Sequence, residues 1–177
     1  NEKVVAIIQA RMGSKRFPGK MMAKLGGYPV LEWVVSRVSK SKKIDQLVVA
    51  TTTSNKDDQI TEYSKRLGVE FYRGSESNVL NRFVCASKKY EADLVVRICA
   101  DNPFVDAAEI DRLIDFYGNI NDKVVISSFP ITIPFGVMEI DEKNNVIFAM
   151  PCLVGESNDS LGRRRLALDS YTRFENH

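Results

Sequence analysis

Short apolar runs alternate with amphipathic segments along the first 130 or so residues of the 177-residue chain. Apolar runs rich in β-branched residues are typical of strands that are buried on both faces of a parallel sheet. Five segments of the chain therefore predict strands. They are residues 3–10, 44–51, 69–74, 93–100 and 123–129.

Between these runs, apolar residues recur at the i, i+3, i+4 spacing of a helix that covers a core. This spacing predicts helices over residues 29–38, 55–68, 79–90 and 107–117. Alternation of strand and helix implies right-handed crossovers, so the predicted class is α/β, an open, mostly parallel sheet with helices on both faces. Ligands of such sheets bind outside the carboxyl ends of the strands. The loops to inspect are residues 10–20, 51–55, 73–77 and 101–106.

The pattern changes after Phe129. Residues 134–150 predict a hairpin with Asn144 and Asn145 in its turn. Residues 151–162 are polar and aperiodic, and residues 163–175 predict a short strand that leads into a helix. The length fits one domain over residues 1–177, with a variable region at about 129–162.

Composition removes several classes of function. No apolar run approaches the ~20 residues that cross a bilayer, and no export signal begins the sequence, so we expect a cytoplasmic protein without a membrane role. A net charge of +2, spread along the chain, does not suggest a nucleic-acid partner. The three cysteines, too few for a disulfide framework or a zinc site, are interpreted as buried thiols. Because the only histidine is His177, the chemistry must use carboxylates, lysines and arginines, with or without a metal ion.

The loop after the first predicted strand, "QARMGSKRFPGK", concentrates positive charge at the expected binding edge. It is not a Walker A loop, because five residues separate Gly13 from Gly19, Pro18 lacks an N–H, and Met21 stands where Ser or Thr should follow the lysine. The Rossmann glycine pattern is also absent. Its four cations suit a polyphosphate. The alternative is an ordinary solvated basic loop.

The segment "IIQARMGSKRFPGKMMAKLGGYPVLEWVVSRV" resembles the signature of the cytidylyltransferase family, which makes CMP-sugars. The resemblance is strongest to the spore-coat-polysaccharide branch, related to CMP-Kdo and acylneuraminate synthetases. It continues through "ATTTSNKDD", "YRGSESNVLNRF", "RICADNPFVDAAEID" and "RLALDSYTRFE", and so covers roughly residues 4–128 and 163–175. It implies a fold like that of the nucleotide-diphospho-sugar transferases.

The resemblance also implies roles for individual residues. Arg11, Arg16 and Lys20 would act catalytically by holding the triphosphate of CTP. The backbone around Ala10, Met12, Gly13 and Ser14 would lie near the nucleotide. The base would be recognised from the loops after the next two strands, by Thr51, Arg73, Gly74 and Ser75.

Two aspartates are candidate ligands of Mg²⁺, which prefers oxygen ligands that it shares with phosphates. Asp101 ends a predicted strand at the binding edge, and its alternative role is to cap the turn before Pro103. The resemblance places Asp169 as the second ligand, with a helix N-cap as the alternative. Asp106 is expected to cap the helix that starts near Ala107.

The implied reaction is attack of a sugar hydroxyl on the α-phosphate of CTP, with release of pyrophosphate. In the family, the region that corresponds to residues 129–162 supplies sugar recognition and a dimer-forming hairpin, so a homodimer is a further expectation. Two alternatives stay open, a glycosyltransferase that consumes a nucleotide sugar and a degenerate, non-catalytic nucleotide-binding subunit. The chain lacks the Asp-x-Asp that the first alternative usually requires, because Asp101 is followed by Asn102 and Pro103.

Overall fold

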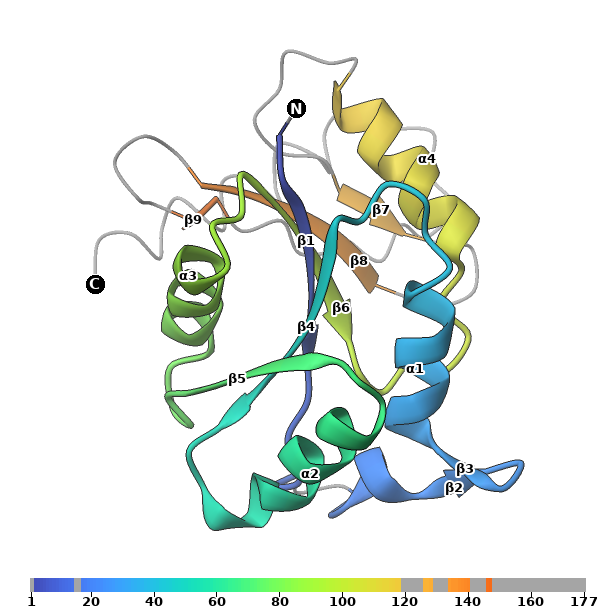
Figure 1. The fold of residues 1–177 in the computed structure, drawn as a ribbon, viewed down its shortest axis with the longest axis vertical. Coiled ribbons are helices and arrows are strands. Elements are labelled where there is room, and N and C mark those ends of the chain that lie inside the picture. Colours follow the sequence, from blue (N-terminus) through green and yellow to red (C-terminus); the bar gives the residue numbers. More distant parts are fainter. Residues whose placement is uncertain (1, 15–16, 119–125, 129–133, 141–145, 148–177) are drawn as a thin grey trace, which may run out of the picture.

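The computed structural model of the chain (Figure 1) describes residues 2–14, 17–118, 126–128, 134–140 and 146–147. Its four α-helices are α1 (Val30–Val38), α2 (Asp58–Arg66), α3 (Val79–Lys89) and α4 (Ala107–Gly118). The strands of the main sheet are β1 (Val4–Gln9), β4 (Gln46–Thr52), β5 (Glu70–Gly74), β6 (Leu94–Cys99), β7 (Ile126–Ser128), β8 (Pro134–Ile140) and β9 (Val146–Ile147). The helices predicted from apolar spacing are confirmed.

The main sheet has the order β5-β4-β1-β6-β8-β7, with β9 paired to β8. The first four strands in this order are parallel to one another, with β1 between β4 and β6. The loops that follow β1, β4, β5 and β6 therefore meet at one edge of the sheet. This arrangement confirms the predicted α/β class.

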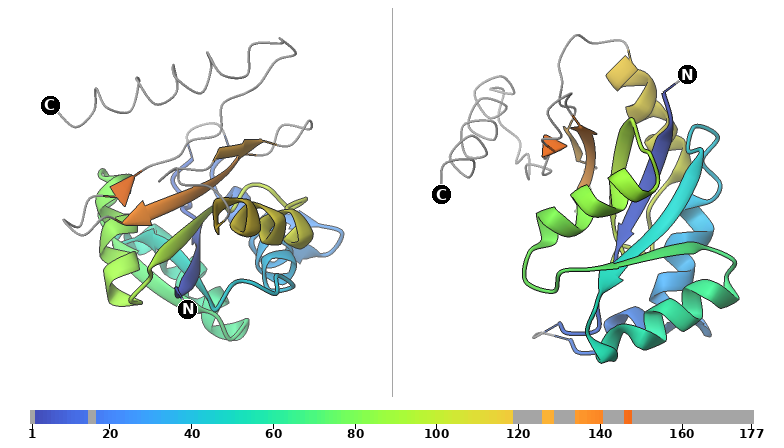
Figure 2. Two further views of the ribbon diagram at one scale, coloured as in Figure 1. Left: turned by 90° about the horizontal axis from the view of Figure 1, so that it is seen from above. Right: turned by 60° about the vertical axis from the view of Figure 1, so that its left-hand side comes forward.

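The two faces of the sheet bury separate cores, as the alternation along β1 shows. Val4, Ala6 and Ile8 pack in one core with residues of α1, α2 and α4. Val5 and Ile7 face the other side, where α3 packs. Among the described helices, Figure 2 shows α3 on one side of the sheet and α1, α2 and α4 on the other. Gln9, the last residue of β1, follows this alternation toward the α3 side and begins the binding edge.

The end of the sheet differs from the regular alternation that the sequence predicts. The predicted hairpin is present as β8 and β9, which pair antiparallel, while its turn at 141–145 lies outside the described residues. However, β8 also inserts between β6 and β7, and it is antiparallel to both. The fifth predicted strand is thus β7 at the sheet edge. Pairing between distant segments fixes this order, and local periodicity carries no information about it.

A small hairpin precedes α1. Strands β2 (Lys24–Leu25) and β3 (Tyr28–Pro29) pair antiparallel. Gly26 and Gly27 form the turn with φ of 58° and 95°, which is the left-handed conformation that a two-residue hairpin turn requires. The Gly-Gly pair is a hairpin signal that our interpretation of the sequence missed. Pro29 is consequently the N-cap of α1 and not its first residue.

The predicted loop and strand at 151–175 lie outside the described residues, and the single-domain assignment stays a prediction. Among the helices that the structure describes, none combines the length and the apolar character that crossing a membrane requires.

Candidate functional site

The loop after β1 folds back on itself around Met12. The Met12 carbonyl accepts hydrogen bonds from the amides of Ser14, at 2.9 Å, and Gly19, at 3.1 Å. Gly19 has a φ of 72°, a conformation that residues with a Cβ seldom adopt. It leads into the short 3₁₀ helix η1 (Lys20–Met22). The loop thereby returns Lys20 to the sheet edge from which it departed.

Asp57 anchors this loop to the neighbouring one. Its side chain is buried and accepts a hydrogen bond from the Met12 amide at 2.7 Å. The other carboxylate oxygen accepts from the Thr51 hydroxyl at 3.0 Å, and from the Thr52 amide and hydroxyl at 3.1 and 2.5 Å. Asp57 ends the short 3₁₀ helix η2 (Asn55–Asp57) and is the N-cap residue of α2. Through these hydrogen bonds it ties the loop after β1 to the end of β4.

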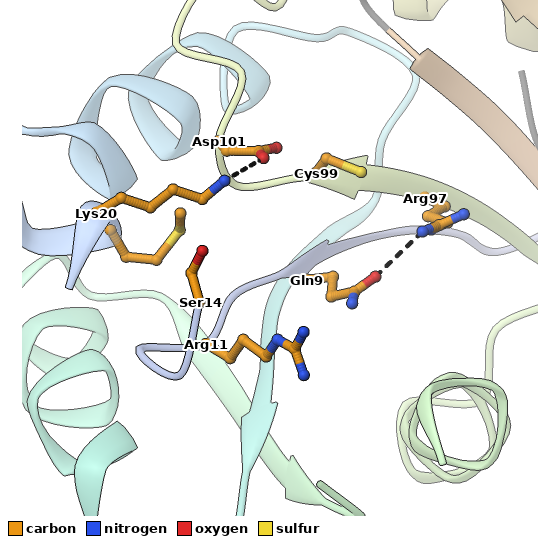
Figure 3. A pocket seen from close by; sticks show the side chains of 8 residues that line it. Gln9, Arg11, Ser14, Lys20, Arg97, Cys99 and Asp101 are labelled. Carbon is orange, nitrogen blue, oxygen red and sulfur yellow. Dashed lines mark hydrogen bonds and ion pairs between the residues drawn. The ribbon is translucent and has the colours of Figure 1, made fainter. Parts of the chain in front are cut away.

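A cavity of about 210 Å³ opens at the carboxyl ends of β1 and β6 (Figure 3). Four residues that the sequence predicts for the site come together in it, namely Arg11, Ser14, Lys20 and Asp101. The remaining lining residues are Gln9, Met21, Arg97 and Cys99. Arg11 and Lys20 come from the loop after β1 and Asp101 follows β6, so the sheet order produces this combination.

Lys20 and Asp101 form an ion pair in this cavity, with 2.5 Å between Nζ and Oδ2. Their side chains are 30% and 48% exposed, so solvent screens the pair and it contributes little to stability. A triphosphate carries several negative charges and can compete with one carboxylate for Lys20. The pair therefore suits a binding role better than a structural one.

Our interpretation of the sequence missed the end of the cavity that lies on β1 and β6. Arg97 donates a hydrogen bond from Nη2 to Gln9 Oε1 at 3.2 Å, and its guanidinium lies 5.6 Å from the centre of the Phe83 ring. Burial raises the pKa of the neighbouring Cys99 thiol. A polar residue at or near the carboxyl end of an otherwise apolar strand, such as Gln9 in β1 and Arg97 in β6, was the available signal.

Arg73, a predicted base-recognition residue, is bound to the loop after β4. Its guanidinium donates to the carbonyl oxygens of Thr52, at 2.9 Å, and Ser54, at 2.8 Å, and pairs with Asp58 at 2.6 Å. Thr51 is fully buried, with its hydroxyl on Asp57. Both side chains thus hold the loop in shape, and their roles toward a nucleotide stay predictions.

Gly74 and Ser75 form the start of the loop after β5. The Gly74 carbonyl accepts a hydrogen bond from the Thr53 amide at 3.1 Å, which joins this loop to the end of β4. Ser75 is partly exposed, and its hydroxyl accepts from the Asn78 amide at 3.0 Å, just before α3. The Gly74 backbone therefore lies next to Thr52, which donates to Asp57.

Three of the backbone amides around the predicted nucleotide site already have hydrogen-bond partners within the protein. The amides of Ala10, Met12 and Ser14 donate to the carbonyl of Ala50, to Asp57 and to the carbonyl of Met12. The loop consequently presents side chains toward the first cavity. A second cavity, of about 520 Å³, is lined by Met12, Gly13, Ser14, Pro18, Gly19, Lys56 and Gln59.

Two predicted site residues, Arg16 and Asp169, lie outside the described residues. Within the part of the chain that the structure describes, no group of three or more potential metal-ligating side chains occurs. Asp106 caps α4 as predicted, because its Oδ1 accepts from the amides of Ala108 and Glu109 at 2.8 and 3.1 Å. That leaves Asp101 as the described candidate for holding a metal ion.

Comparison with known proteins assigns the chain to a family. The sequence model of the family described as cytidylyltransferase matches residues 5–148. The spore coat polysaccharide biosynthesis protein SpsF of Bacillus subtilis is 40% identical over 115 residues, which cover 63% of this chain and 48% of SpsF. The 3-deoxy-manno-octulosonate cytidylyltransferase of Bdellovibrio bacteriovorus is 31% identical over 153 residues, covering 85% and 59%.

A solved structure supports the same family. A cytidylyltransferase from Leptospira borgpetersenii matches with a TM-score of 0.72 at 32% identity, over 78% of this chain and 61% of that one. This chain spans about half the length of the curated relatives that it matches. The match extends through β1, the loop after it, and the strands that bring Arg11, Lys20 and Asp101 together. The chain belongs to the cytidylyltransferase family.

Proposed function

We propose that this protein transfers the cytidylyl group of CTP to a hydroxyl of a sugar, for use in surface polysaccharide synthesis. The observation that carries the proposal is the cavity at the carboxyl ends of β1 and β6, which gathers Arg11, Lys20 and Asp101. Cations on a loop at that edge suit a triphosphate, and an adjacent carboxylate suits the metal ion that accompanies it. Membership of the family favours this reaction over the glycosyltransferase alternative.

The proposed step is an in-line displacement at phosphorus. The sugar hydroxyl oxygen forms a bond to the α-phosphorus of CTP, the bond from that phosphorus to the α,β-bridging oxygen breaks, pyrophosphate leaves, and the hydroxyl proton passes to water. Arg11 and Lys20 bind the phosphates and offset the charge that collects on the leaving pyrophosphate. Because positioning and charge neutralisation supply most of such catalysis, the site needs no histidine.

Asp101 fits the role of a metal ligand. It is exposed at the end of β6 and lines the cavity, and Mg²⁺ is commonly bound through one or two carboxylates together with substrate phosphates. We propose Asp101 and Asp169 as the carboxylates that hold it. A bound Mg²⁺ would polarise the α-phosphate and neutralise its charge. Lys20, released from Asp101, would then be free to bind the phosphates.

The test is substitution of Asp101 by Asn, with Asp115→Asn as the matched control. Asp115 also pairs with a lysine, Lys43, at 2.6 Å, but this pair lies away from the cavity residues. Pyrophosphate release is measured with CTP, Mg²⁺ and a panel of sugars that includes acidic ones, and Mg²⁺-dependent CTP binding is measured by calorimetry. D101N should lower both turnover and Mg²⁺-dependent binding by about a hundredfold, whereas D115N should match the unsubstituted protein.

Both variants should unfold at nearly the original temperature, because exposed ion pairs contribute about 1 kcal/mol or less. Full activity of D101N would refute the assignment of Asp101. CTP binding by the unsubstituted protein, without pyrophosphate release from any sugar, would favour the alternative of a non-catalytic nucleotide-binding subunit.

A further inference from the structure

Arg82 is a fully buried arginine on the first turn of α3. Its Nη1 donates a hydrogen bond to the carbonyl of Ser75. Nε and Nη2 are buried and have no hydrogen-bond partner among the described residues. A buried guanidinium without full pairing is energetically costly. An arginine exposed to solvent would not have this cost, so the burial of Arg82 indicates a role in function.

The surroundings of Arg82 are those of the candidate site. Burial lowers the pKa of Arg82, and the positive charge of Arg11 lowers it further, while the carboxylates of Asp57 and Glu76 act in the opposite direction. Arg82 is therefore electrostatically close to the loop after β1 and to the aspartate that anchors that loop. It is absent from the lining of both cavities described above.

Gly74 provides the space through which the Arg82 side chain passes. A Cβ added at Gly74 would lie 2.7 Å from Cε1 of Tyr72 and 3.0 Å from Cγ of Arg82. The first distance is shorter than real Cβ contacts and the second is at their lower limit, so the neighbouring side chains would have to move. The glycine at the end of β5 and the buried arginine on α3 thus form one packing unit, which holds the start of the loop after β5.

We propose that Arg82 is a positioning residue for base recognition, which fixes the Gly74–Ser75 backbone from beneath so that CTP is distinguished from UTP. This inference rests on the proposed function, together with the prediction that Gly74 and Ser75 recognise the base. Cytosine presents an N4 amino donor where uracil presents an O4 acceptor. A fixed backbone group discriminates between them, because the wrong base leaves a polar group unpaired. The Ser75 carbonyl keeps one lone pair after it accepts from Arg82.

The test compares equilibrium binding of CTP and of UTP, each with Mg²⁺, to four proteins. These are the unsubstituted chain, Arg82→Met, Arg82→Lys and the control Ser87→Ala. Methionine keeps an apolar stem and removes every donor, and lysine keeps a charge but loses the planar fork that reaches the Ser75 carbonyl. Ser87 is also buried on α3, and its hydroxyl donates to the Val84 carbonyl, away from the loop.

The expected result is a preference for CTP in the unsubstituted chain that S87A retains. In R82M the preference should fall by about tenfold or more, mainly through weaker CTP binding, with R82K between the two. An effect on stability alone would not change the ratio of the two affinities. If R82M is unfolded by circular dichroism, R82K decides the question.

Three results would count against parts of the argument in different ways. An unsubstituted chain that binds neither nucleotide overturns the proposed function. A chain that binds CTP and UTP equally, or folded R82M or R82K with an unchanged ratio, overturns the role of Arg82 and leaves the proposed function standing.

Discussion

The carboxylate of Asp57 should be necessary for the shape of the loop after β1, and Asp57→Asn tests this with the smallest change of size. In the native chain one carboxylate oxygen accepts from the Met12 amide, and the other accepts from Thr51 and Thr52. Asparagine offers only one oxygen, and its NH₂ group must face either the Met12 amide or the threonine donors. The three threonine donors outnumber the single amide, so Met12 should lose its partner.

The cost can be estimated from these contacts. Hydrogen bonds to a charged acceptor contribute about 1.5–3 kcal/mol each, and a buried donor left unpaired costs about 1–3 kcal/mol. Loss of the Met12 bond, together with weaker bonds to a neutral oxygen, should lower the free energy of unfolding by about 2–3 kcal/mol. For a chain of this length, that corresponds to a fall in Tm of about 5–10 °C. CTP affinity should also fall, because Arg11 and Lys20 lose the fixed loop that carries them.

The assay is thermal and urea unfolding, followed by calorimetric titration with CTP and Mg²⁺ at a temperature where the variant is folded. Asp58→Asn is the matched control, since it makes the same change one residue later at a carboxylate that is about half exposed. Its effect on stability should be below about 1 kcal/mol. A D57N protein with unchanged Tm and unchanged CTP affinity would refute the anchoring role. Equal losses in D57N and D58N would show that general loss of acidic charge, and not the Met12 contact, is responsible.

Two further predictions concern packing and pH. Gly74→Ala should lower the free energy of unfolding by about 1–3 kcal/mol, because the new Cβ meets Tyr72 and Arg82. The control Gly118→Ala should leave stability unchanged, because a Cβ at Gly118 has no atom within 4 Å. A G74A protein as stable as the unsubstituted chain in urea titration would contradict the packing described above. Burial, with the charge of Glu70, raises the pKa of Tyr90 to about 12, and its hydroxyl donates to the Phe71 carbonyl at 2.9 Å. The unfolded chain therefore releases this proton near pH 10 while the folded chain retains it, so the contribution is complete below pH 10 and is lost as pH rises through 12. Urea unfolding at pH 9 and 11.5 should show that Tyr90→Phe removes part of this alkaline loss, on the order of 2 kcal/mol, and equal alkaline losses in both proteins would exclude the effect.

Most of the fold follows from local periodicity. The alternation of Val4 to Ile8 predicts a strand buried on both faces, and the structure divides its side chains between two cores. Asp106 is a cap that spacing alone identifies. The position of β8 does not follow in this way, because its pairing with β6 joins residues about 40 positions apart. A hairpin has the same pattern whether it stands alone or enters a sheet.

The site was partly predictable for a related reason. Arg11, Lys20 and Asp101 follow strands that the sheet order brings together, so the rule about carboxyl ends finds them. The sequence did not identify Asp57 and Arg82 as buried residues near the site, because charged residues in helical segments are usually exposed. A helical signal for Arg82 existed, since it lies three residues after Val79 and four before Ala86, on the face that packs against the sheet. Asp57 offered no comparable signal, because its partners come from the loop after β1 and from the end of β4.

These two buried charges explain why the loop after β1 differs from a Walker A loop. A Walker loop cradles phosphates with free backbone N–H groups. Here the amides of Met12 and Ser14 are already used, one by Asp57 and one within the loop. In the proposed function we therefore expect the arginines and lysines of "QARMGSKRFPGK" to bind the phosphates. Flexible cations bind precisely only if their backbone is fixed, and Asp57 fixes it from one side while Arg82 fixes the neighbouring loop. In the proposed function, the buried charges of Asp57 and Arg82 thus hold the loops whose exposed cations bind the nucleotide.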